Sequence, residues 1–481
     1  MIPTRREVFL EDKEYEPAYV LLFTIASSMI WIMVPGLAFL YSGLSRRKSA
    51  LSMLWIVIVS SFVCVFQWYF WGYSLAFSKS GNSFIGNLHA FGFKTVLGKT
   101  NDDSVYPQIA FAIFQMQFLL VTIAIMAGGL VAERGRFVPA LVFMFCWATV
   151  VYSPVVYWIW GGGWASTWRG GALDYAGGGP VEILSGVSVF VYSAFLGKRN
   201  PTLMINFRPH NISTIFLGTS MLYVGWLFFN GFSCGNASVK VPYSMMNTHL
   251  SGAFGAITWC LLDYRLEGKW SMVGICSGCI SGLVAATPAS GFIPLWASVI
   301  MGIVSGVVCN FSTQLKYLCH VDDSLDVLAE HGIAGMIGLL FNGIFGSATV
   351  AGYDGVTDHA GGWIDHNWKQ LYIQIVYILA TTAYSAAVTA ILCFVINKIP
   401  GLHLRVDYNA EEQGVDEDQI GEFAYDYVEV RRDFLDWGAP LGYQTEAASA
   451  APAAAEVLQA VDASAEGSSN EEPINISEKR D

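Results

Sequence analysis

The chain has 481 residues, of which 54% are hydrophobic and only 13% are charged. Soluble domains carry about twice that share of charged residues, so the composition excludes an ordinary soluble domain and indicates a membrane protein. The formal net charge of −12 comes largely from acidic residues near the C-terminus. It argues against nucleic-acid or anionic-lipid binding as the main activity, because both need clustered Lys and Arg.

The first segment, residues 1–17, mixes both signs of charge and lacks the basic start and short apolar core of a cleavable signal. Beyond it, hydropathy predicts eleven apolar runs, each near the length of about 20 residues that crosses a bilayer. These runs are 18–43, 50–77, 107–131, 137–160, 180–197, 212–233, 247–264, 271–289, 293–312, 327–347 and 370–397. The predicted fold is therefore an all-α polytopic membrane protein with a transmembrane domain over residues 18–397.

The connectors after the odd-numbered spans carry more Lys and Arg than the connectors on the other side. This bias predicts an extracellular N-terminus and a cytosolic C-terminus. An odd span count with termini on opposite sides is compatible with two inverted five-helix halves plus one extra helix. Asp174 ahead of Glu182 in the fifth span, and Asp326 ahead of His331 in the tenth, support this internal repeat.

Two further regions follow the last span. Residues 398–438 are predicted to form a cytosolic region, in which regularly placed acids and glycines precede aromatic residues: Glu411, Gly414, Asp416, Gly421 and Glu422. Residues 439–481 are rich in Ala, Ser and Glu, a composition typical of a disordered acidic tail.

Glu182 and His331 are the ionisable residues within spans that most need an explanation. Each costs about 2.5–3.5 kcal/mol to insert, so such groups usually face a bundle interior or a path. One interpretation is a hydrogen-bonded pair that only locks two helices together. We favour a permeation path, because a carboxylate beside an imidazole can share or pass a proton.

Acids also precede two of the spans. Asp174 stands ahead of the fifth span, whereas Asp322, Asp323 and Asp326 crowd the start of the tenth. A carboxylate at a helix start accepts hydrogen bonds from the free amides of the first turn. We expect capping at both places, and at Asp174 the anion also draws cations to an outer mouth.

Aromatic residues gather at the predicted outer span ends together with one hydroxyl: Phe118, Trp160, Trp226, Phe229 and Ser233. Taken singly, each aromatic residue is explained by packing. Together they suit a small cation that loses its water, which needs ring faces and one or two acceptors. Phe118 and Phe229 could also stack as a constriction. No metal-site spacing, phosphate loop or nucleophile elbow is present, so we expect no cofactor, no metal and no enzymatic activity.

These residues carry a resemblance that spans nearly all of residues 20–430. Asp174-Tyr175-Ala176-Gly177-Gly178-Gly179-Pro180-Val181 resembles the signature of the ammonium transporter, methylammonium permease and Rhesus family, most closely its fungal permeases. Further matches are Ala132-Glu133-Arg134, Gly225-Trp226 with Phe229-Asn230, and Asp326 with His331-Gly332.

The resemblance implies a multi-pass protein of the plasma membrane, embedded in lipid as a homotrimer, with ammonium and methylammonium as substrates and no nucleic-acid partner. It implies an outer recruitment site of Phe118, Trp160 and Ser233, a gate of Phe118 and Phe229, and structural support of the outer site by Asp174. Trp226 would line the pore. The tail residues from Glu411 to Glu422 resemble a regulatory motif, which could meet cytosolic regulators.

The resemblance also identifies a departure. Family members usually have two histidines facing each other in the pore; His331 matches the second, whereas Glu182 stands in place of the first, a variant of some fungal members. Our hypothesis is that ammonium is recruited outside, loses a proton, and crosses as ammonia and a proton relayed by Glu182 and His331. The alternatives are an ammonium sensor that signals through its tail and a passive channel for ammonia or carbon dioxide.

Overall fold

The computed structural model describes residues 16–96, 106–204 and 207–425. Contacts divide the chain into residues 1–423 and 424–481, and we describe the first unit by itself. The predicted extracellular segment, except its last two residues, and the predicted tail at 439–481 lie outside the described residues. Within those described, every regular element is helical apart from one antiparallel bridge between Gly135 and Arg405.

The longer helices follow the predicted spans. In chain order they are α2 (Pro17–Trp31), α3 (Met33–Leu44), α4 (Ala50–Gln67), α5 (Tyr73–Phe77), α6 (Gln108–Val131), α7 (Phe137–Trp147), α8 (Ser153–Ile159), α10 (Leu184–Leu196), α11 (Ile212–Gly231), α12 (Lys240–Glu267), α13 (Met272–Ala289), α14 (Leu295–Ser312), α16 (Ala334–Phe345) and α18 (Lys369–Lys398).

Four π-helical turns join or open these helices: η2 (Trp68–Gly72), η4 (Ala148–Tyr152), η6 (Gly178–Ile183) and η9 (Leu328–Ile333). Shorter pieces fill the connectors: η1 (Arg47–Ser49), η3 (Phe91–Phe93), α9 (Trp164–Thr167), η5 (Trp168–Gly170), η7 (Pro201–Met204), η8 (Phe232–Cys234), α15 (Leu315–Leu318), α17 (Ala348–Ala351), η10 (Gly352–Asp354), η11 (Trp363–Asp365), α19 (Tyr408–Gln413) and α20 (Val415–Gln419).

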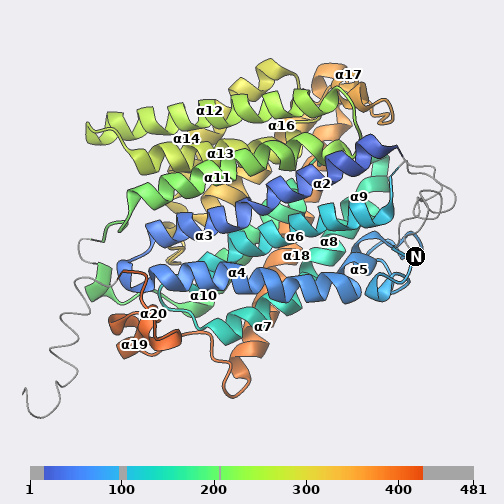
Figure 1. Cartoon of the computed structure of the whole chain (residues 1–481). Helices are drawn as coiled ribbons and strands as arrows, with labels where there is room; N and C mark the ends of the chain where they lie inside the picture. Colours follow the sequence, from blue (N-terminus) through green and yellow to red (C-terminus); the bar gives the residue numbers. More distant parts are fainter. Residues whose placement is uncertain (1–15, 97–105, 205–206, 426–481) are drawn as a thin grey trace, which may run out of the picture. The chain divides into compact units, whose positions relative to one another are not determined.

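Ten segments among the described residues are long and apolar enough to cross a membrane. Helix α12 is not among them, although its 28 residues make it one of the longest helices. Figure 1 shows the long helices running side by side, with α11, α12, α13 and α14 packed together and α3, α4, α6 and α10 forming a second set of neighbours. Because a helix satisfies its own backbone hydrogen bonds, such a bundle suits the membrane interior.

Small residues let the helices approach closely. A Cβ on Gly278 of α13 would lie 2.6 Å from the carbonyl oxygen of Gly255 in α12. Helices in membranes associate through such small-residue contacts, because lipid supplies no hydrophobic drive between them.

Another close crossing places the two ionisable residues of the predicted path. The helix formed by η6 and α10 meets the helix formed by η9 and α16. A Cβ on Gly186 would collide with the backbone of Gly332, and one on Gly335 would lie 2.7 Å from the Cβ of Glu182. The crossing therefore brings η6, which carries Glu182, directly against η9, which carries His331.

The two crossing helices begin alike, but the counterpart of Asp174 is Asp323 and not Asp326 as predicted. The Asp174 carboxylate accepts the N–H of Gly179 at 2.8 Å, and the Asp323 carboxylate accepts the N–H of Leu328 at 2.9 Å. Both acids thus bond the amide five residues further on, at the start of a π-helical turn.

Capping by all three acids of the tenth span is accordingly wrong for two of them. Asp322 binds Arg199, whose Nε and Nη2 lie 2.9 and 3.0 Å from its carboxylate oxygens. Asp326 binds the ammonium of Lys316 at 2.7 Å. These two acids pair with cations from neighbouring connectors, because burial of a carboxylate without a partner costs more than an ion pair.

The first residues of the predicted cytosolic region pack on the helix bundle. Asp416 accepts the N–H of Leu51 at 3.0 Å and that of Ser52 at 2.7 Å, at the start of α4. Glu411 accepts the N–H of Asn200 at 2.6 Å and binds Arg405 at 2.7 Å. Both carboxylates are buried, so this part of the region is a structural element of the first unit.

Candidate permeation path

A cavity of about 380 Å³ opens at one end of the bundle, between α6, α8 and the connectors around them. Its lining includes Phe118, Trp160 and Ser233, the three residues predicted to recruit the substrate, together with Asp174. The structure therefore brings together side chains from four separate parts of the chain.

Asp174 faces its own loop with the carboxylate. It accepts hydrogen bonds from the amides of Gly177, Gly178 and Gly179 at 3.0, 2.6 and 2.8 Å, and from the Tyr377 hydroxyl at 3.2 Å. Burial raises the pKa of the Asp174 carboxyl, an effect that these four donors oppose. The capping interpretation of Asp174 is confirmed by this geometry.

The main chain of Asp174 also fixes the cavity wall. Its carbonyl oxygen accepts the indole N–H of Trp160 at 3.1 Å. The Trp160 ring in turn stands edge-on to Phe118, with ring centroids 5.9 Å apart. A change in the loop around Asp174 would therefore move an aromatic wall of the cavity.

Two stacked phenylalanines lie beside the cavity. The ring centroids of Phe118 and Phe229 lie 4.0 Å apart at an interplanar angle of 29°, and both residues are buried. The Ser233 hydroxyl donates to the carbonyl oxygen of Phe229 at 2.6 Å. Because this bond uses its hydrogen, the Ser233 oxygen keeps its lone pairs available as acceptors.

Trp226 lies beyond the phenylalanine pair. Its ring centroid is 6.1 Å from that of Phe229 and 6.4 Å from that of His331. Its indole N–H donates to the Thr287 hydroxyl oxygen at 2.9 Å, which holds the ring in place. The Trp226 ring thus lies near both the stacked phenylalanines and the pair of Glu182 and His331.

Glu182 and His331 form a direct hydrogen bond. The Nδ1 atom of His331 lies 2.8 Å from Oε2 of Glu182, and the residues are 2% and 0% exposed. The other carboxylate oxygen, Oε1, has no hydrogen-bond partner among the described residues. The pair therefore keeps one buried acceptor that can take a further proton donor.

Sequence reasoning missed an ion pair at the cavity. The Lys240 ammonium, 1% exposed, donates at 2.8 Å both to Asp354 and to the carbonyl of Ala351, and lies 5.5 and 5.1 Å from the ring centroids of Tyr175 and Phe292. In the sequence, Lys240 counted only as a connector cation. Its position in a helical run that continues to the predicted seventh span was the available signal.

Tyr377 and Thr287 were also missed. Tyr377 reaches Asp174 from α18, and Thr287 reaches Trp226 from α13. Neither residue breaks the apolar pattern of its span, so only the packing of distant helices reveals the contacts.

Comparison with known proteins identifies the family. The model of the Ammonium Transporter Family matches residues 21–425. The ammonium transporters MEP3 and MEP1 of Saccharomyces cerevisiae are each 59% identical to the chain, and the alignments cover 90% and 89% of this chain and 89% and 87% of theirs.

Solved structures agree with this result. The crystal structure of Candida albicans Mep2 superposes with a TM-score of 0.80 at 44% identity, covering 88% of this chain and 94% of that one. The crystal structure of Saccharomyces cerevisiae Mep2 gives 0.78 at 45% identity, covering 83% and 93%. The chain therefore belongs to the ammonium transporter family, in its fungal Amt/Mep permease group, and is a multi-pass membrane transporter rather than an enzyme.

Proposed function

We propose that the chain carries ammonium and methylammonium across the plasma membrane along the path from the outer cavity to Glu182 and His331. The single observation that carries the proposal is the hydrogen-bonded pair of Glu182 and His331, buried beneath two stacked phenylalanine rings. The relatives, which are named as ammonium transporters, support ammonium as the substrate.

The topology belongs to the same proposal. We place α12 as the seventh of eleven transmembrane helices, because 28 residues at about 1.5 Å each span about 42 Å, more than a hydrocarbon core of about 30 Å. With the cation-rich connectors inside, the N-terminus is extracellular and the C-terminus cytosolic. The matching starts of η6 and η9 support two inverted halves. We also propose the homotrimer that the family resemblance implies.

Recruitment takes place in the outer cavity. Ring faces and lone pairs replace part of the water around a small cation, and Phe118, Trp160 and Ser233 supply these groups. Asp174 keeps the surrounding loop in shape through its three amide bonds. The two carboxylates of the cavity lining are already bound, Asp174 to its own loop and Asp354 to Lys240, which leaves ammonium binding weak enough for release into the path.

Beyond the cavity, the stacked rings of Phe118 and Phe229 act as a gate. An apolar constriction rejects a charged ion, because removing a charge from water without a partner is expensive, but it admits neutral ammonia. The proton released by ammonium needs a separate acceptor. Oε1 of Glu182, with no partner among the described residues, receives it while the carboxyl group releases the proton held on Oε2 to Nδ1 of His331 along their hydrogen bond.

The test compares the uptake of substrate with the electrical current that accompanies it. Methylammonium uptake and ammonium-evoked currents are measured in cells that lack their own ammonium transporters, for the wild-type protein and for Glu182→Gln and His331→Ala. We expect both variants to lose current, with uptake falling less in Glu182→Gln because the amide keeps the shape of the side chain. Leu379→Ile, a conservative change at an exposed position of α18, is the control and should behave like the wild type.

Unchanged uptake and current in both pore variants would overturn the relay. Wild-type uptake without any current would instead favour passive passage of ammonia. The sensor alternative predicts a nitrogen response that is lost when residues beyond Ala439 are deleted although transport persists. The names of the relatives, all of them transporters, favour transport over that alternative.

A further inference from the structure

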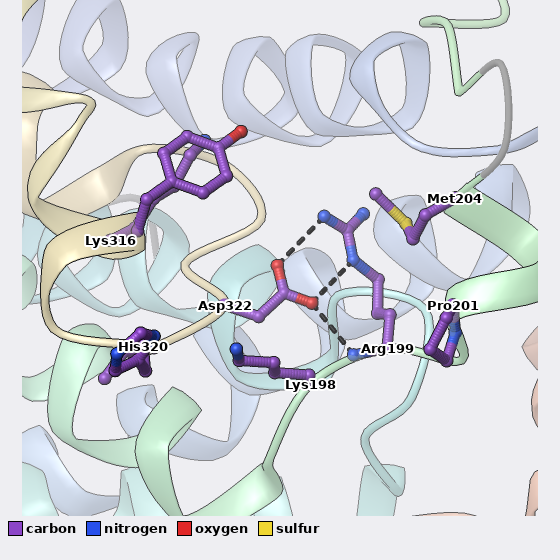
Figure 2. A pocket seen from close by; sticks show the side chains of 9 residues that line it. Lys198, Arg199, Pro201, Met204, Lys316, His320 and Asp322 are labelled. Carbon is purple, nitrogen blue, oxygen red and sulfur yellow. Dashed lines mark hydrogen bonds and ion pairs between the residues drawn. The ribbon is translucent and has the colours of Figure 1, made fainter.

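A second cavity lies at the opposite end of α10 from Glu182. It has a volume of about 410 Å³, within the range of about 300–1,000 Å³ of small-ligand pockets. Two connectors build it, the one after α10 and the one after α14, and Figure 2 shows their side chains around the space. Its lining includes four basic residues, Lys198, Arg199, Lys316 and His320, and a single acid, Asp322.

Both carboxylate oxygens of Asp322 are bound by one of the four basic residues, Arg199. The guanidinium of Arg199 donates to both oxygens of Asp322 and, through Nη1, to Glu133 at 3.1 Å. Burial alone would raise the pKa of the Asp322 carboxyl, but the hydrogen bonds and charge of Arg199 lower it to about 2. Arg199 and Asp322 therefore hold each other in place on one side of the cavity; the dashed lines in Figure 2 mark their bonds.

The other cations keep binding capacity. Within the described ranges, the Lys316 ammonium bonds the two carboxylate oxygens of Asp326, and since an ammonium has three donors, at least one remains. Neither Lys198 nor His320 forms an ion pair with any residue in the described ranges. Donors from two connectors thus face one space without enough acceptors.

The remaining lining is apolar and reaches the surface. It consists of Pro201, Met204, Tyr317 and Val321. Tyr317 is 66% exposed, and its neighbour Leu318 is 77% exposed. An exposed aromatic and aliphatic pair at the end of a membrane helix is typical of the level where lipid head groups lie. Basic pockets at this level between membrane helices are suited to phosphate-bearing head groups.

We propose that this cavity binds a phosphate group, carried by the head group of an anionic phospholipid at the inner membrane surface or free as inorganic phosphate. A phosphate presents oxygens in several directions, which suits point charges such as Lys198 and Lys316 that approach from separate connectors. The net charge of −12 gives no indication of this site, because its basic residues stand far apart in the sequence and only the fold brings them together. The proposal does not rest on ammonium transport.

The test measures binding to the purified full-length protein in detergent. The probes are dioctanoyl phosphatidylinositol 4-phosphate, inorganic phosphate and dioctanoyl phosphatidylcholine as the zwitterionic lipid. We expect saturable binding of at least one of the first two. Lys198→Gln should weaken it about fivefold, which corresponds to about 1 kcal/mol for one cation near the surface. His320→Gln in addition should weaken it further.

Lys269→Gln is the matched control, because it removes one exposed cation from the turn between α12 and α13, outside the cavity. Binding of the lipid alone would identify the head group as the source of the phosphate, and binding of inorganic phosphate alone would identify the free anion. Equal losses in Lys198→Gln and Lys269→Gln would overturn the site. So would phosphatidylcholine binding as tightly as the anionic probe, or no saturable binding of either phosphate probe.

Discussion

Replacing Asp174 by Asn tests whether this carboxylate supports the outer cavity as a structural element. Asn keeps one acceptor oxygen, which can serve Gly177 and Gly178, but its amide group then faces the N–H of Gly179. A buried donor without a partner costs about 1–3 kcal/mol, and the two remaining bonds lose the strengthening that charge provides. We therefore expect the variant to be about 3 kcal/mol less stable than the wild type.

Tyr377→Phe is the matched control, because it removes the 3.2 Å hydrogen bond to the same carboxylate and keeps the aromatic ring. Its expected cost is about 1 kcal/mol. Each kcal/mol lowers the melting temperature by roughly 2–4 °C in a domain of 150–250 residues and by less in a longer chain. Thermal unfolding in detergent should therefore show a fall of several degrees for Asp174→Asn, roughly three times that of Tyr377→Phe.

Methylammonium uptake by the same two variants separates structure from direct binding. If Asp174 acts through the loop, uptake falls together with the melting temperature, because the Trp160 wall moves with the loop. Loss of uptake at an unchanged melting temperature would refute the reasoning, since the carboxylate would then act on the substrate itself.

Three further changes follow from the structure. Ser233→Ala removes an acceptor from the cavity and should raise the KM for methylammonium about fivefold at an unchanged maximal rate; an unchanged KM would exclude Ser233 from recruitment. Because the pKa of Asp322 falls from 3.8 to about 2 on folding, its pair with Arg199 should add on the order of 2 kcal/mol that is fully present above about pH 4 and lost toward pH 2. The melting temperature should therefore change less with pH across that range in Asp322→Asn than in the wild type. An equal pH dependence of the melting temperature in both proteins would count against the pair. Lys240→Met leaves Asp354 buried without its cation and should cost about 3–5 kcal/mol; adding Asp354→Asn should restore part of the melting temperature, and no restoration would locate the effect elsewhere.

Hydropathy predicted the long helices well where lipid-facing and core-facing positions are both apolar. The predicted span 107–131 corresponds to Gln108–Val131, and the span 212–233 begins at the same residue as α11. It failed at the start of α12, which begins at Lys240 and not at the predicted residue 247. Asn247 in this helix bonds the carbonyls of Ser290 and Ile293 at 2.7 and 3.0 Å. A hydropathy scale counts such a side chain as polar, although the fold satisfies it between helices.

The sequence predicts the parts of the candidate site that place ionisable residues in apolar spans, but it does not predict the contacts that depend on how distant helices pack. The expense of placing Glu182 and His331 in apolar spans was enough to expect them to share one environment, and the structure joins them at 2.8 Å. The contact of Tyr377 with Asp174 carries no comparable signal, because a tyrosine in a span is ordinary. The choice of Asp323 over Asp326 depends on the π-helical turn at η9, which periodicity does not reveal.

The correction at Asp323 sharpens what is unusual about the proposed pore. Asp174 precedes Glu182 by eight residues, and Asp323 precedes His331 by eight residues, so the two ionisable side chains occupy equivalent places in the two crossing helices. The two halves therefore share the capping aspartates Asp174 and Asp323 but differ in the ionisable residue that follows, which is Glu182 in one half and His331 in the other. An imidazole offers one atom on each side of the ring, whereas a carboxylate bonded to His331 through Oε2 keeps Oε1 as a second acceptor and can carry negative charge. The pH dependence of conduction should therefore differ from that of a pore with two histidines, and Glu182→His is the substitution in which that difference should disappear.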